Sequence, residues 1–165
     1  MRDWYIKVNK FVRHLTFIRS PILIKRILSG YFNTLILGKD ILRSIELAIT
    51  YKCQAKCHKC YTANLQNNSR VYLTVEQIKH IIGQAMHLGL IHVNITGGEP
   101  TLRKDLLEVI EACRPHEIMV SLVTNSLTLT REKMKSFKEA GLNTIQISLD
   151  SADRVIHDKL RGVSG

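Results

Sequence analysis

From residue 43 onward, short runs of β-forming residues alternate with segments whose apolar residues recur at helical spacing. We predict strands at RSIELAIT (43–50), LIHVNIT (90–96), EIMVSLVT (117–124) and NTIQISL (143–149). We predict helices between them at 74–88, 101–114 and 131–140. Such alternation is typical of α/β proteins, in which right-handed helical crossovers join parallel strands. A ligand site is then expected where the carboxyl ends of the strands meet.

Local signals support these helices. The first has a capping box from Thr74 to Gln77, and the third is followed by Gly141 as a stop. The apolar face of the first consists of Val75, Ile78, Ile82 and Ala85. That of the second consists of Leu102, Leu106, Val109, Ile110 and Cys113, with Pro115 beyond its end. Because Cys113 lies on this face, we interpret it as a core residue without a ligand role.

Residues 1–42 differ from the rest of the chain in charge and pattern. Up to Gly30 they contain seven basic residues and one acid, interleaved with apolar and aromatic residues. This pattern predicts two basic amphipathic helices, the second beginning at Ser20 and Pro21 and ending at Gly30. They either pack on the domain with a solvated basic face or contact a membrane surface. We therefore expect a helical extension over 1–42 and a core over 43–165.

Composition limits the class of protein further. The chain has 165 residues, of which 45% are hydrophobic and 23% charged, as is ordinary for one globular domain. No apolar run reaches the roughly 20 residues of a spanning helix, and the N-terminus lacks a secretory pattern. We expect a cytoplasmic protein, peripheral at a membrane at most. The net charge of +10 suggests nucleic acid, but no recognition motif accompanies it, so we expect no nucleic-acid partner.

Chemically unusual residues follow every predicted strand. They are a cysteine loop (53–60), TGGEP (96–100), TNS (124–126) and SLD (148–150), in chain order. One such segment alone is a weak signal, because a glycine pair also forms a plain tight turn. Since all four open onto one edge of the sheet, we predict a single site there.

The cysteine loop contains three of the four cysteines of the chain, Cys53, Cys57 and Cys60. In a reducing compartment, clustered thiols favour a metal over a disulfide. Three thiolates leave a tetrahedral zinc site incomplete unless His58 or His92 supplies the fourth ligand. They suffice for three irons of a [4Fe-4S] cluster, whose fourth iron then binds a small molecule. Three hypotheses follow for the protein: an enzyme that uses the open iron, an iron-sulfur electron carrier, and a zinc-stabilised binding module.

Four segments, in this order, resemble the N-terminal two-thirds of a radical S-adenosylmethionine (radical SAM) enzyme core: CQAKCHKC (53–60), TGGEPTLRKDL (96–106), VTNS (123–126) and ISLDSADRVIHDKLRGVSG (147–165). The resemblance covers residues 43–165. It implies a partial (β/α)6 TIM-like barrel, of which about four βα units are present. It also implies that the three cysteines hold a [4Fe-4S] cluster, and that a reducing partner such as flavodoxin or ferredoxin supplies an electron. Reductive cleavage of S-adenosylmethionine then gives a 5′-deoxyadenosyl radical for hydrogen abstraction.

The resemblance also assigns cofactor contacts. In GGEP, Gly97 and Gly98 let the backbone approach the methionyl amine, and Glu99 offers a carboxylate to the same group, followed by Pro100. Read without the resemblance, Glu99 and Pro100 also suit the start of a helix.

Later segments carry further implied contacts. Ser148 and Asp150 are implied to contact ribose hydroxyls or nearby methionyl groups, and Arg161 to pair with the methionyl carboxylate. Asn125 is either a wall of the cofactor pocket or a turn residue, and Asp150 also suits a helix cap. Lys59 stands just before the third cysteine, where the family often has a planar side chain near the adenine. A lysine stem still covers a ring edge, so we expect a weaker contact there and no loss of the cluster.

The substrate is not specified by these residues. The CY that ends the cysteine motif (60–61) and the segment HDKLRG (157–162) resemble those of family members that modify a peptide, a protein or a cofactor precursor. The basic N-terminal segment fits a lipid-like substrate equally well. Because four βα units fall short of six, we expect the chain to be part of a longer enzyme, poorly soluble and with little turnover on its own.

Overall fold

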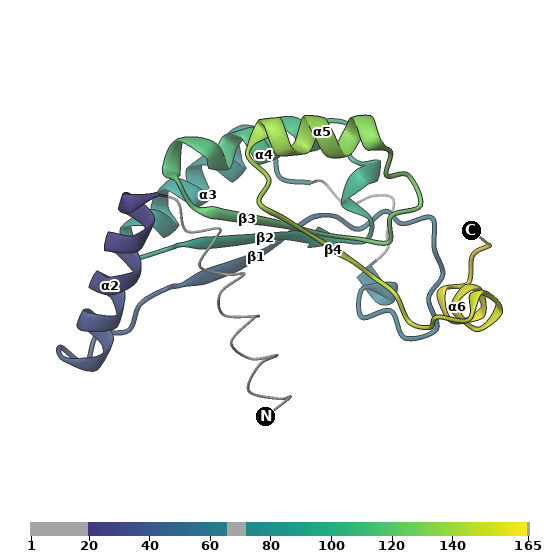
Figure 1. The fold of residues 1–165 in the computed structure, drawn as a ribbon, viewed down its shortest axis with the longest axis horizontal. Helices are drawn as coiled ribbons and strands as arrows, with labels where there is room; N and C mark the ends of the chain where they lie inside the picture. Colours follow the sequence, from purple (N-terminus) through teal and green to yellow (C-terminus); the bar gives the residue numbers. More distant parts are fainter. Residues whose placement is uncertain (1–19, 66–71, 165) are drawn as a thin grey trace, which may run out of the picture.

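The computed structural model describes residues 20–65 and 72–164, and its centre is one four-stranded sheet (Figure 1). The strands are β1 (Ser44–Thr50), β2 (His92–Gly97), β3 (Met119–Thr124) and β4 (Thr144–Ile147). They lie in the order β1-β2-β3-β4, and every neighbouring pair is parallel. The predicted α/β class and the four βα units are thereby confirmed. The fourth strand is shorter than predicted, because Ser148 and Leu149 lie beyond its end.

Three helices, α3 (Val75–His87), α4 (Leu106–Cys113) and α5 (Arg131–Ala140), cover one face of the sheet (Figure 1). Alternate strand residues point toward these helices and form matching cross-strand rows, such as Leu47, Ile95 and Leu122, all buried. Ile78 and Ile82 of α3 are fully buried against the same core. Burial of this apolar layer stabilises the fold by about 25 cal/mol per Å² of surface removed from water.

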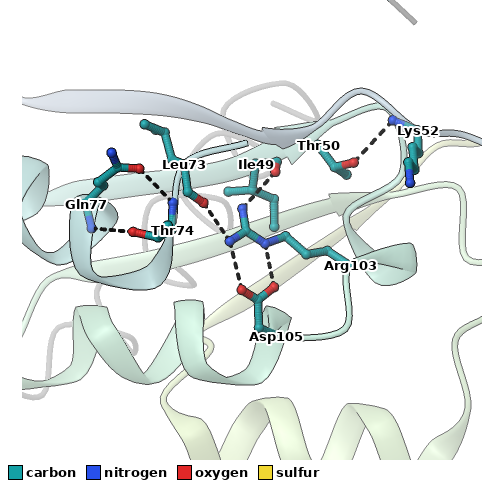
Figure 2. Close-up of polar contacts among 8 residues, drawn as sticks. All are labelled: Ile49, Thr50, Lys52, Leu73, Thr74, Gln77, Arg103 and Asp105. Atoms are coloured by element: carbon teal, nitrogen blue, oxygen red, sulfur yellow. Dashed lines mark hydrogen bonds and ion pairs between the residues drawn. The ribbon is translucent and has the colours of Figure 1, made fainter. Parts of the chain in front are cut away.

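The capping box predicted for α3 is present. The Thr74 side chain accepts a hydrogen bond from Gln77 N, and the Gln77 side chain accepts one from Thr74 N (Figure 2). The predicted stop after α5 is also present, since Gly141 has a left-handed φ of 113°.

The second predicted helix was wrong at its beginning. A short 3-10 helix, η2 (Pro100–Leu102), is separated from α4 by a turn, and Leu102 is 40% exposed instead of sharing the buried face. The guanidinium of Arg103 donates to the carbonyls of Ile49 and Leu73, both at 2.8 Å, and pairs with Asp105 (Figure 2). These bonds hold the turn away from helical geometry and connect it to β1 and to the start of α3.

The helix α2 (Pro21–Leu35) confirms a start at Ser20, whose side chain caps Leu23 N. The predicted stop at Gly30 was wrong, because the helix continues to Leu35. Gly30 is instead a point of close approach: a Cβ there would overlap the guanidinium of Arg43, which donates to two carbonyls of α2. The other predicted N-terminal helix lies outside the described residues, and the boundary between 1–42 and 43–165 stays a prediction. Among the helices that the structure describes, none has the length and apolarity to cross a membrane.

Candidate cofactor site

The ends of β2 and β3, together with the segments that follow β1 and β4, line one cavity of about 120 Å³. Eight of the residues predicted for the site line it: Cys53, Cys57, Cys60, Gly97, Gly98, Asn125, Ser148 and Arg161. Glu99, Pro100 and Asp150 lie beside it without lining it. Lys59, which replaces a planar residue of the family pattern, is also on the wall.

The glycine pair joins the cysteine loop to β2. Gly98 N donates to Thr50 O at 2.7 Å, and Glu99 N donates to Lys52 O at 2.8 Å. Gly97 has a φ of 143°, and a Cβ on either glycine would overlap a carbonyl of residues 50–52. Glycine is therefore required here by the approach of two backbone segments, whatever the cavity binds.

Glu99 is fully buried and faces the end of β3. Its Oε1 accepts hydrogen bonds from Thr101 N, Thr101 Oγ1 and Thr124 Oγ1 at 3.1, 2.6 and 2.7 Å. Its Oε2 accepts one from Asn125 N at 2.7 Å. The bond to Thr101 N caps η2, as the alternative interpretation of Glu99 and Pro100 required. The carboxyl thus fixes the loop that carries Asn125, and its remaining acceptor capacity is on Oε2.

The cysteine loop is also held by a helix about 100 residues further along the chain. Lys56 N donates to Arg161 O at 3.1 Å, and His58 N donates to Leu160 O at 2.9 Å. These carbonyls belong to the last turn of α6 (Arg154–Arg161), where no intrahelical partner remains for them. The helix is followed by Gly162 in the left-handed region, where a Cβ would overlap Lys56 O. One helix end and one loop therefore satisfy each other's backbone groups.

Each loop cysteine has a different side chain close to its sulfur. Asn125 Nδ2 lies 3.7 Å from Cys53 Sγ, and Arg161 Nη1 lies 3.7 Å from Cys57 Sγ. Thr62 Oγ1 lies 3.3 Å from Cys60 Sγ. All three contacts are within the range of hydrogen bonds to sulfur.

Arg161 and Asp150 form an ion pair beside the cavity. Arg161 Nε lies 2.7 Å from Asp150 Oδ2, although its N–H is not directed well enough at that oxygen to count as a hydrogen bond. Asp150 does not cap α6, because Asp153 has that role through a bond from Ile156 N. The alternative of a helix cap at Asp150 was therefore wrong.

The four cysteines have different environments. Cys113 is fully buried in the core, and this burial raises the pKa of its thiol to about 12, as suits a residue without a ligand role. Partial burial also raises the pKa of the Cys53 thiol, with a smaller contribution from the charge of Glu99. A metal that binds Cys53 must therefore displace a proton that the protein alone would retain.

The donor set fits a cluster better than a single ion. In the two described stretches, no three Cys, His, Asp or Glu side chains converge as ligands of one metal ion. A [4Fe-4S] cluster takes one thiolate per iron, so its ligands surround the metal group without converging on one point. Of the two histidines proposed as a fourth zinc ligand, His92 lies at the opposite end of β2, where its ring contacts Ser44 and Ser121. His58 is exposed within the cysteine loop itself. The three thiols and the glycine pair face one cavity.

No role was predicted for several further residues of the site. Tyr61, Thr62 and Thr96 all line the cavity, and Tyr61 Oη lies 3.1 Å from Thr96 Oγ1. Thr62 is only 2% exposed although it directly follows an exposed tyrosine. The only available signal was their position next to the cysteine and glycine motifs.

The fold and the site together define an α/β protein in which a loop after β1, the end of β2 and the end of α6 place three thiols, two glycines and an arginine around one cavity. Residues 47–164 match the model of the Radical SAM superfamily, and the chain belongs to this superfamily. Members of the family use S-adenosylmethionine and a [4Fe-4S] cluster.

Relatives of known name include cyclases of two kinds. A probable GTP 3′,8-cyclase of Pyrococcus horikoshii is 37% identical over 72% of this chain and 38% of its own length. A PqqA peptide cyclase of Bradyrhizobium diazoefficiens is 30% identical over 72% of this chain and 31% of its own. This chain therefore spans well under half the length of these curated relatives.

Solved structures agree in fold. Streptococcus suis SuiB bound to its precursor peptide SuiA superposes with a TM-score of 0.68 at 21% identity, over 98% of this chain and 39% of SuiB. BtrN in complex with AdoMet and 2-DOIA gives a TM-score of 0.59 at 16% identity, over 76% of this chain and 51% of BtrN. The partial, TIM-like barrel that the sequence predicted is the fold that these proteins share.

Proposed function

We propose that the residues around this cavity form the cluster-binding and cofactor-binding part of a radical SAM enzyme that abstracts hydrogen from its substrate. The observation that carries the proposal is the single cavity onto which Cys53, Cys57 and Cys60 open beside Gly97 and Gly98. In this proposal the three thiolates hold a [4Fe-4S] cluster. When bound and reduced, the cluster supplies the electron for cleavage of S-adenosylmethionine.

The residues of this chain bind and orient the cofactor. Gly97 and Gly98 leave their backbone open to the methionyl amine, and Pro100 fixes the turn after them. Glu99 is buried beside the cavity, so it acts on that amine only through the acceptor capacity left on Oε2. Ser148 and Asn125 offer further polar groups to the cavity, and Arg161, which forms an ion pair with Asp150, offers a cation to the methionyl carboxylate. Lys59 contributes an aliphatic stem near the adenine.

Anaerobic reconstitution of the full chain with iron and sulfide tests the proposal. We expect a brown protein whose reduced EPR spectrum changes when S-adenosylmethionine is added. Replacement of any loop cysteine by Ala should abolish iron binding, whereas Cys113→Ala, the matched control, should leave the iron content unchanged. Binding of zinc in preference to iron would reject the proposal that the protein is a radical SAM enzyme. An iron cluster that does not respond to the cofactor would favour an electron carrier.

We propose a reducing, cytoplasmic setting, a low-potential partner such as flavodoxin or ferredoxin, and a peptide or a cofactor precursor as substrate. The relatives named as peptide and GTP cyclases support this choice of classes. Incubation with dithionite, S-adenosylmethionine and candidates of each class, followed by mass spectrometry, discriminates between them. If the chain is part of a longer protein, the same assay requires that protein in full.

A second proposal is contact with a membrane surface through α2. Its exposed apolar residues stand close to Lys25 and Arg26 along the helix: Ile22, Ile24, Leu28, Tyr31, Phe32 and Leu35. A basic amphipathic helix of this composition suits an anionic lipid surface. Co-sedimentation with anionic vesicles, but not with neutral ones, should occur and should decrease in Leu28→Ser. Equal sedimentation of the original chain and Leu28→Ser with anionic vesicles would reject the proposed membrane contact.

A further inference from the structure

Three side chains that donate hydrogen bonds surround the three cysteine sulfurs, one donor to each. They come from different parts of the chain: Thr62 from the loop itself, Asn125 from the segment after β3, and Arg161 from the end of α6. The Asn125 amide nitrogen and the Arg161 guanidinium can act only as donors. The Thr62 hydroxyl must donate once Cys60 is a thiolate, because a thiolate has no proton to give.

The orientation of the Asn125 amide is fixed by other bonds. Its Oδ1 accepts from Leu127 N at 3.1 Å and from Gln54 Nε2 at 3.3 Å, which leaves Nδ2 directed at Cys53. Its backbone N–H is bonded to Glu99. The amide therefore has little freedom to turn its oxygen toward the sulfur.

The other two donors are held by burial. Thr62 is only 2% exposed. The Arg161 side chain is 17% exposed and lies against Asp150. A hydrogen bond to a charged group is stronger than a neutral one, and water competes less at buried positions. These contacts are therefore more than incidental surface pairs.

We propose that Thr62, Asn125 and Arg161 are positioning residues that set the reduction potential of the cluster. This inference rests on the proposed function, because it requires a [4Fe-4S] cluster on Cys53, Cys57 and Cys60. Reduction by one electron from an external low-potential donor adds negative charge that the thiolate sulfurs share. Donors at those sulfurs stabilise the reduced state more than the oxidised state, and so they raise the potential.

Thr62→Val is the sharpest test, because it removes a buried hydroxyl and changes the shape of the side chain little. The reconstituted full chain is analysed for iron and sulfide and then titrated with dithionite, with EPR as the readout. We expect an unchanged iron content and a reduction that is about three- to tenfold less favourable. A tenfold change corresponds to about 59 mV more negative for a one-electron couple. The matched control is Thr144→Val, since Thr144 is exposed at the opposite end of β4 and should leave the potential unchanged.

Two further variants test the other donors. Arg161→Gln removes a cation and should lower the potential, and Asn125→Ala should lower it by a smaller amount. Equal potentials for all three variants and the original chain, with clusters intact, would overturn the inference and leave the proposed function standing. Failure of the unsubstituted chain to assemble a cluster would instead reject the proposed function itself.

Thr62→Ser covers the case in which Thr62→Val loses its cluster, because serine keeps the hydroxyl without the methyl group. A cluster restored in Thr62→Ser at the original potential would support a contact between hydroxyl and sulfur. Loss of the cluster in both variants would assign Thr62 to packing and would overturn its place in the inference.

Discussion

Replacement of Glu99 by Gln tests whether this carboxyl acts first on the fold or only on the cofactor. The side chain is fully buried and its two oxygens accept four hydrogen bonds from three residues. A glutamine amide keeps one oxygen and replaces the other with an NH₂ group. Two of the four donors are backbone N–H groups, which cannot reverse their direction.

Both orientations of the amide leave one backbone donor without an acceptor. With its oxygen at the Oε1 position, its NH₂ faces Asn125 N–H, which lies 2.7 Å from Oε2 in the structure. With the amide reversed, the NH₂ faces Thr101 N–H, although the two threonine hydroxyls can rotate to accept. A buried unsatisfied donor costs about 1–3 kcal/mol, and a bond to a charged group contributes about 1.5–3 kcal/mol. These terms overlap, so we expect a loss of about 2–4 kcal/mol in the free energy of unfolding.

Urea unfolding followed by circular dichroism, without iron or S-adenosylmethionine, measures this loss directly. For a chain of this size, about 2–4 kcal/mol also lowers Tm by roughly 4–16 °C. Glu139→Gln on the exposed surface of α5 is the control and should change stability by less than about 0.5 kcal/mol. If Glu99→Gln were as stable as the control and lost only cofactor binding, the carboxyl would be directed at the ligand and the reasoning from its hydrogen bonds would be wrong.

Three further predictions follow from other contacts. Gly97→Ala should lower the free energy of unfolding by more than about 1 kcal/mol, because its φ of 143° and the nearby Thr50 carbonyl both exclude a Cβ; equal urea midpoints would contradict this. In the metal-free protein at pH 8, an alkylating reagent should modify the three loop thiols and spare Cys113, whose thiol has its pKa raised to about 12 by burial; mass spectrometry of native and urea-unfolded samples checks this. The hydrogen bond from Arg103 lowers the pKa of Asp105, so its stabilisation is complete above the unfolded pKa of about 3.9 and is lost as pH falls through the folded value. The stability difference between the original chain and Asp105→Asn should therefore shrink below about pH 4 in urea titrations, and a constant difference would refute the pairing.

The sheet and its helices could be predicted because each is encoded locally. Alternating and helical periodicities identify the buried faces, and the capping box around Thr74 marks the start of α3 without any tertiary information. The two wrong helix bounds, at Gly30 and at Leu102, both involve an arginine that bonds to backbone distant in sequence. Arg43 donates to two carbonyls of α2 and occupies the space where a side chain at residue 30 would stand. Arg103 donates to the carbonyls of Ile49 and Leu73 and so holds the turn after Leu102 away from helical geometry.

The sequence predicted the position of the site more completely than the contacts between its side chains. The rule that ligands gather at the carboxyl ends of parallel strands brought four separate segments to one edge, and eight predicted residues do line one cavity. Whether they bind a cluster and its cofactor stays a prediction. The direction of the Glu99 carboxyl and the partners of the three sulfurs could not be read from spacing, because they depend on which side chains the folded backbone places face to face.

The bonds from Lys56 and His58 to the end of α6 have a consequence for the order of events during synthesis. The ribosome must add 161 − 56 = 105 residues after Lys56 before Arg161 exists to accept its bond. At about 5–20 residues per second, this interval is roughly 5–20 s. During that time the three thiols are present on a loop that lacks its final support. For the cluster of the proposed function, iron delivered early would meet a loop without these two bonds, so we expect assembly to be favoured once translation has passed α6.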